Sequence, residues 1–228
     1  MTGRAAKPYA AITTLRATTP LAAPAPTWAS AGPGPPAAWL VPAPPNLDCA
    51  GSRDVLLRSI AEHEPDLREH SLLVAALALR VAAVLGLDAA SREGVARAAE
   101  LHDVGKLAIP GTVLRKPGPL DPAEVELMRR HSEIGEAIVR AAPALGRAAA
   151  VVRASHERWD GGGYPDGLAG ETIPLGARIV AVCDAYSAMR QARPYGDVLT
   201  DVEARAELVR CAGTQFDPSV VEAFCRGR

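Results

Sequence analysis

From residue 51 onward, apolar residues recur with the spacing of an α-helix, and no run alternates apolar and polar side chains between turn residues as a strand would. This pattern predicts an all-α fold. The expected helices lie near residues 52–62, 67–85, 90–102, 122–141, 145–156, 174–190, 201–210 and 217–226. Two segments, 109–120 and 160–173, are expected to be non-helical, and connections of this length often have a functional role.

The first 50 residues differ in composition from the rest of the chain. They contain half of the 20 prolines and a single acidic residue, Asp48. Because proline removes amide donors and disfavours helix, we expect a disordered arm or linker over residues 1–50 and one folded domain over residues 51–228. No apolar run approaches the roughly 18 residues of a membrane span, which predicts a soluble, cytoplasmic protein with no membrane partner.

The charge of the chain argues against a nucleic-acid partner. The formal net charge is −1, and residues 51–228 contain 22 basic and 25 acidic side chains with no basic stripe. Proteins that bind nucleic acid neutralise phosphates with clustered lysines and arginines, which this chain lacks. The four cysteines show no metal-type spacing and are expected to be unpaired thiols.

Four of the five histidines lie at helical spacing from apolar neighbours, so they should face the core. They are His70, His102, His131 and His156. A single buried histidine is usually a core residue hydrogen-bonded to a carbonyl group. Four buried imidazoles on separate helices need a shared partner for their ring nitrogens, and a metal centre provides one.

Two aspartates and a lysine strengthen the metal hypothesis. Asp103 directly follows His102, and Asp184 lies among small apolar residues on its helix. A buried carboxylate beside histidines needs a cation. Gly105 is expected to break the helix after Asp103 and to bring Lys106 close, where it would supply a positive charge for an anionic substrate. A solvated surface lysine is the alternative interpretation of Lys106.

The order of these motifs resembles a known family. After His70 come HDVGK at residues 102–106, MRRHSEIG around His131, and SHERWDGGGYPDGLAGETIPLGARIVAVCDAYSAMRQARPY at residues 155–195. Together they resemble the HD-GYP phosphodiesterases, a branch of the HD metallohydrolase superfamily that cleaves cyclic di-GMP. The resemblance covers roughly residues 52–226 and implies an HD-domain helical bundle with the C-terminal helical extension of HD-GYP proteins.

The resemblance also implies a set of metal ligands. These are His70, His102, Asp103, His131, His156 and Asp184. Asp103 would bridge two ions, one bound by His70, His102 and Asp184. The other ion would be bound by His131 and His156. Family members use iron or manganese, which suit mixed imidazole and carboxylate ligands.

The implied reaction is attack on phosphorus by a hydroxide held between the two metals, giving linear pGpG and, in some members, GMP. Asp103 and Lys106 would be the catalytic residues. Substrate contacts are expected from Lys106, Arg193, Gly163 and Tyr164. The Gly-Tyr-Pro loop would also be a contact for a diguanylate cyclase partner.

The chain departs from the family pattern at several positions. Ser155 replaces a histidine and Gly196 a lysine or arginine, so one imidazole and one phosphate contact are lost. Ser187 replaces the second aspartate of its motif, and Ser132 replaces a proline. Asp66 has the spacing of a glutamate that supplies a third metal in some members, but is expected to be a residue of the first helical turn.

These departures leave three functions open. The first is an active cyclic di-GMP phosphodiesterase. The second is a relative with reduced or no activity that binds nucleotide or a protein partner. The third is hydrolysis of another nucleotide by the same kind of site.

Overall fold

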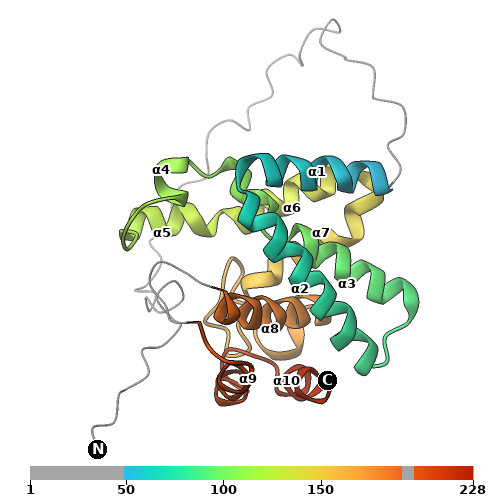
Figure 1. Cartoon of the computed structure of the whole chain (residues 1–228). Helices are drawn as coiled ribbons and strands as arrows, with labels where there is room; N and C mark the ends of the chain where they lie inside the picture. Colours follow the sequence, from blue (N-terminus) through green and yellow to red (C-terminus); the bar gives the residue numbers. More distant parts are fainter. Residues whose placement is uncertain (1–48, 192–197, 228) are drawn as a thin grey trace, which may run out of the picture. The chain divides into compact units, whose positions relative to one another are not determined.

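The computed structural model describes residues 49–191 and 198–227, which form helices joined by loops (Figure 1). In these residues the nearest approach to a sheet is one isolated bridge between Ala212 and Phe216, so the all-α prediction is confirmed. The α-helices are α1 Cys49–His63, α2 Pro65–Val84, α3 Ala89–Leu101, α4 Gly111–Leu114, α5 Pro122–Arg129, α6 His131–Ala141, α7 Gly146–Arg153, α8 Leu175–Arg190, α9 Asp201–Arg210 and α10 Pro218–Arg226. Short 3-10 helices are η3 Val104–Ala108, η4 Pro143–Leu145, η5 Ala154–His156 and η6 Gly170–Thr172.

The prediction of one helix over residues 122–141 was wrong, because α5 ends at Arg129 and α6 begins at His131. Arg130 between them keeps right-handed helical dihedrals, φ −62° and ψ −15°. The apolar spacing therefore continues across the break, and periodicity alone cannot reveal it. The start of α5 was predicted correctly. Asp121 and Glu124 form a capping box ahead of the first turn.

Other segment boundaries also needed correction. The segment 109–120, expected to be non-helical, contains the single turn α4, and 160–173 contains η6. The helix expected over 145–156 is α7 with short 3-10 helices on both sides. The predicted arm of residues 1–50 lies outside the described residues except for its last two, which begin α1, so that prediction is untested.

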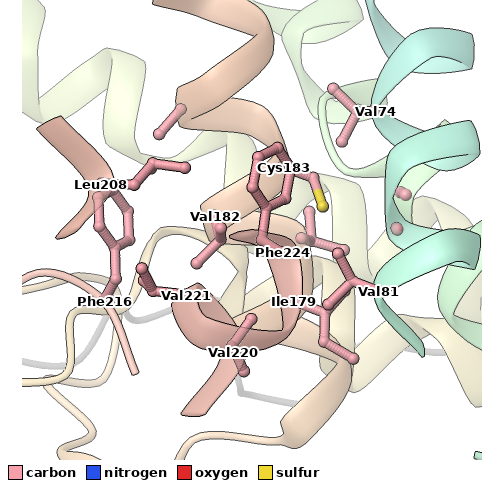
Figure 2. Packing of buried hydrophobic residues seen from close by; sticks show 14 of the residues in the cluster. Val74, Val81, Ile179, Val182, Cys183, Leu208, Phe216, Val220, Val221 and Phe224 are labelled. Atoms are coloured by element: carbon pink, nitrogen blue, oxygen red, sulfur yellow. The ribbon is translucent and has the colours of Figure 1, made fainter. Parts of the chain in front are cut away.

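The two largest apolar clusters hold most of the described domain together. The larger joins α2, α3, α8, α9 and α10, and Figure 2 shows its side chains interlocking around Val182 and Phe224. The smaller joins α1, α3, α6 and α7 around Leu101 and Val152. Helix α3 contributes to both clusters, so its C-terminal end is fixed from two sides. No helix in the described part of the chain has the length and apolar character needed to cross a membrane.

Gly105 has a packing role that differs from the one predicted. The helix ends earlier, at Leu101, and Gly105 lies inside η3. A Cβ atom at Gly105 would lie 1.9 Å from the carbonyl oxygen of His131 and 2.6 Å from the amide nitrogen of Gly135. Both atoms belong to the backbone of α6, so no side chain can move aside. Glycine at this position therefore lets η3 approach α6.

We predict that Gly105→Ala lowers the free energy of unfolding by about 3 kcal/mol or more, since η3 and α6 would have to separate. Urea denaturation of the metal-free protein, followed by circular dichroism, measures this. Gly94→Ala in α3 is the matched control. A Cβ there meets nothing within 4 Å, so the variant should be unchanged or more stable by roughly 0.5–1 kcal/mol. Equal effects of the two substitutions would contradict the packing role.

Candidate metal centre

The structure brings all six candidate ligands together from separate elements. His70 lies in the second turn of α2, and Asp184 lies in α8. The other four lie at or beyond helix ends: His102 and Asp103 directly follow α3, His131 is the first residue of α6, and His156 ends η5. At these ends the backbone leaves the regular helix, which lets the neighbours His102 and Asp103 point to one place.

The six side chains form two sets of three. One set is His70, His102 and Asp184, and the other is Asp103, His131 and His156. Within each set the candidate ligand atoms all lie within 4.8 Å of one another. In the first set, Nε2 of His70 lies 2.9 Å and Nε2 of His102 lies 3.9 Å from Oδ1 of Asp184. Both sets are mostly buried, so a cation held by either set would be largely shielded from solvent.

The carboxylate of Asp103 lies between the two sets. Its Oδ1 is 3.5 Å from Nε2 of His131 and 3.9 Å from Nε2 of His156, whereas its Oδ2 is 3.4 Å from Nε2 of His102. Lys106 donates a hydrogen bond of 2.6 Å from Nζ to the same Oδ2. One carboxylate therefore faces both sets, as a bridging ligand would.

Hydrogen bonds fix two of the imidazoles in the tautomer that a metal ligand needs. Nδ1 of His102 donates to the carbonyl oxygen of Ala99 at 2.7 Å, and Nδ1 of His131 donates to that of Met128 at 2.6 Å. Because a carbonyl oxygen only accepts, each proton lies on Nδ1, and the Nε2 lone pair faces the centre.

Ser187, which the sequence marked only as a departure from the family, contacts a candidate ligand. Its hydroxyl lies 3.0 Å from Nδ1 of His70 and is fully buried. A hydroxyl can donate or accept, so it can satisfy Nδ1 whether the ring proton lies on Nε2, toward Asp184, or on Nδ1. Ser187 is therefore placed to orient His70.

Electrostatics favour the ligating forms of these side chains. Burial lowers the pKa of His131 to about 4 and that of His156 to about 3, so both rings are neutral near pH 7. Burial opposes the charged form of Asp103, but Lys106 and the surrounding histidines outweigh it and hold the pKa of that carboxyl well below its usual range. The pKa of Asp184 is likewise lowered, because the hydrogen bond with His70 and the charge of His102 outweigh its burial.

Unsatisfied atoms show that a cation fits this site. Among the described residues, Nε2 of His102, His131 and His156 and Oδ1 of Asp103 are buried without a hydrogen-bond partner. Orphaned buried polar atoms are rare in folded proteins, and here four converge. Neutral imidazoles and carboxylates are ligands of divalent transition metals. The chemistry of the donor set therefore suits divalent metal ions.

Ser155 does not contribute to this cluster. Its hydroxyl donates to the carbonyl oxygen of Val152 at 2.8 Å, and the side chain is buried. The second set thus has two imidazoles and the shared carboxylate as its candidate ligands.

The glycine loop after His156 folds back over the centre. A Cβ at Gly163 would lie 2.4 Å from the backbone nitrogen of Arg158 and 2.5 Å from Cα of Glu157. Only glycine therefore lets the loop pack this closely against the backbone of residues 157 and 158. The next residue, Tyr164, stacks on the His156 ring with centroids 5.2 Å apart and planes 7° apart. The tyrosine expected to contact substrate therefore covers a candidate ligand.

Glu157, which the sequence analysis did not single out, anchors this loop. Its buried carboxylate accepts hydrogen bonds from the amides of Asp166 at 2.7 Å and Leu168 at 3.1 Å. Arg153 pairs with the Asp166 side chain through two hydrogen bonds. The only signal for Glu157 in the sequence is its place directly after His156, which does not show that its carboxylate turns toward the loop.

Some expected site residues are not tested by the described part of the chain. Arg193 and Gly196 lie outside the described residues.

The backbone of Asp66 lies in the first turn of α2, as expected. His63, the fifth histidine of the chain, is exposed at the end of α1. Cys183, Cys211 and Cys225 are free thiols, in agreement with the prediction for those three.

Comparison with known proteins gives the class of this domain. The HD domain family matches residues 54–220, most of the described chain. The protein therefore belongs to the HD domain family.

Curated relatives are cyclic dinucleotide phosphodiesterases. The response regulator RpfG of Xanthomonas campestris, a cyclic di-GMP phosphodiesterase, is 46% identical over 150 residues, 65% of this chain and 40% of RpfG. A cyclic di-GMP phosphodiesterase of Thermotoga maritima is 38% identical over 174 residues, 75% of this chain and 47% of the relative. A 3'3'-cGAMP-specific phosphodiesterase of Vibrio cholerae is 41% identical over 155 residues, 67% of this chain and 30% of the relative. The chain thus spans less than half the length of these three relatives.

A solved structure shares the fold. It is that of Bd1817, described as an HDG"Y"P protein from Bdellovibrio bacteriovorus, with a TM-score of 0.56 at 19% identity over 69% of this chain and 51% of the other. At this identity the likeness concerns the fold alone. The family match and the curated relatives confirm the family resemblance seen in the sequence.

We predict that Ser187→Ala weakens metal binding at the His70 set by about tenfold, because His70 loses the partner of its Nδ1. Titration of the metal-free protein with manganese, followed by calorimetry, measures this. Ser132→Ala is the matched control, because Ser132 is also fully buried but its hydroxyl has no hydrogen-bond partner among the described residues. Equal affinities of the two variants would show that the Ser187 hydroxyl does not orient His70.

Proposed function

We propose that this chain hydrolyses cyclic di-GMP to linear pGpG, to GMP, or to both, at a centre of two divalent metal ions. The observation that carries the proposal is the Asp103 carboxylate, whose two oxygens face two different sets of buried ligands. A shared carboxylate between two histidine sets is the arrangement expected of a two-metal phosphohydrolase. The curated relatives that act on cyclic dinucleotides support the choice of substrate.

In this proposal His70, His102 and Asp184 would hold the first ion. His131 and His156 would hold the second, and Asp103 would serve both ions. When bound, the cations would lower the pKa of water and neutralise charge on the phosphoryl oxygens. Iron or manganese would suit this mixture of imidazole and carboxylate ligands.

The remaining roles fall to side chains around the ligands. Lys106 keeps Asp103 ionised through its hydrogen bond, and its partly exposed ammonium group would contact the substrate phosphate or the departing ribose oxygen. Tyr164 and the backbone at Gly163 would contact the nucleotide where the loop covers the centre. We assign Arg193 to a phosphate contact on the family resemblance alone. The exposed outer residues of the loop, such as Gly162 and Asp166, would offer a surface to a diguanylate cyclase.

A turnover assay tests the proposal. We expect the manganese- or iron-loaded protein to release pGpG or GMP from cyclic di-GMP, and we expect chelation to abolish the release. The substrate panel should include 3'3'-cGAMP and cyclic di-AMP, because one relative is specific for 3'3'-cGAMP. Fully loaded protein with no turnover of cyclic di-GMP would contradict the proposal. Turnover of only another nucleotide would support the third function considered above.

Reduced activity is the second candidate, and the position of Ser155 favours it. Ser155 replaces a histidine of the family pattern, so the second set lacks a further imidazole at this place. The Ser155 hydroxyl donates a hydrogen bond to the carbonyl oxygen of Val152. Such a protein would act as a module that binds nucleotide or a protein partner.

We predict that Ser155→His raises the affinity for the second ion and, with it, the turnover number, by about tenfold. Metal content after dialysis and single-turnover kinetics at limiting manganese measure the two effects. Ser132→His, which adds a histidine at another buried serine, controls for unspecific metal binding. A Ser155→His variant with no gain in either measurement would show that Ser155 does not limit activity.

A further inference from the structure

One of the four candidate ligand histidines lacks the hydrogen bond that orients the others. His70, His102 and His131 each have a partner for Nδ1, at 3.0, 2.7 and 2.6 Å. Within the described residues, neither ring nitrogen of His156 makes a hydrogen bond, and its Nε2 is buried. An imidazole without such a partner can rotate about its side-chain bonds, and a misdirected ring is a poor ligand.

Aromatic contacts replace that hydrogen bond. The Tyr164 ring is nearly parallel to the His156 ring, with centroids 5.2 Å apart, and the His131 ring meets His156 edge-on at 4.7 Å. The Tyr164 and His131 rings together therefore limit how the His156 ring can turn.

Arg129, at the end of α5, contacts that tyrosine. The central carbon of its guanidinium group lies 5.4 Å from the Tyr164 ring centroid, within the range of a cation–π contact. Its Nη1 donates to Glu126 at 2.8 Å, whereas its Nε is buried without a hydrogen-bond partner in the described structure. The contact with the Tyr164 ring offsets the hydrogen bond that the buried Nε lacks. A cation–π contact is stronger where water is excluded.

We propose that Arg129 is a positioning residue for the second metal site. Its guanidinium group holds Tyr164 against His156, so that Nε2 of His156 stays directed at Asp103. The inference rests on the proposed two-metal centre and deepens it, because it assigns the occupancy of the second site to a residue that binds no metal. Arg129 also lies two residues before His131, so the segment that supplies one ligand of this site orients the other.

The test compares manganese binding by variants of Arg129. Titration of the metal-free protein, with electron paramagnetic resonance, separates a single ion from an exchange-coupled pair. We expect Arg129→Gln to weaken binding of the second ion by about tenfold or more and to leave the first unchanged. Arg129→Lys, which keeps the charge, should recover part of the loss. Arg130→Gln, at an exposed arginine, is the matched control and should bind both ions as the native protein does.

Two variants of Tyr164 test the same role without changing Arg129. Tyr164→Phe keeps the ring and should retain the coupled pair, whereas Tyr164→Leu removes the ring and should behave like Arg129→Gln. Native affinity for both ions in Arg129→Gln would overturn the inference, as would a change confined to the KM for substrate, which indicates a direct phosphate contact. A native protein that never binds a second ion would overturn the proposed centre itself, and the native titration alone reveals that outcome.

Discussion

The arrangement of this domain depends on one buried carboxylate. Asp103 is almost completely buried, yet its pKa is held well below the usual range by Lys106 and the histidines around it. A charge in this position is tolerated only with partners on both sides, and the two ligand sets supply them. The close approach at Gly105, two residues later, keeps the turn that carries Asp103 against α6, which supplies His131.

The ends of the helices give the centre its geometry. In a regular helix, the side chains of neighbouring residues point about 100° apart and cannot both contact one small ion. Here His102 and Asp103 lie beyond the end of α3, and His131 lies at a new helix start made possible by the break at Arg130. The two apolar clusters meet on α3 and fix these ends, so the buried core sets the distances between ligands.

The sequence alone predicted the helical class and all six residues that the structure brings together, because helical periodicity and residue chemistry are local properties. It did not predict the helix break at Arg130, where backbone dihedrals stay helical. It did not predict the roles of Arg129 and Glu157, which come from contacts with Tyr164 and with the loop amides. In the sequence, Ser187 was notable only because it replaces an aspartate of the family pattern. Its contact with His70, 117 residues earlier, arises from the packing of α8 on α2.

The most direct test of this account is a crystal structure of the manganese-loaded protein with anomalous scattering measured at the manganese edge. We expect two anomalous peaks about 3.5–4 Å apart, one on each side of the Asp103 carboxylate. A single peak, or two peaks that do not share Asp103, would contradict it.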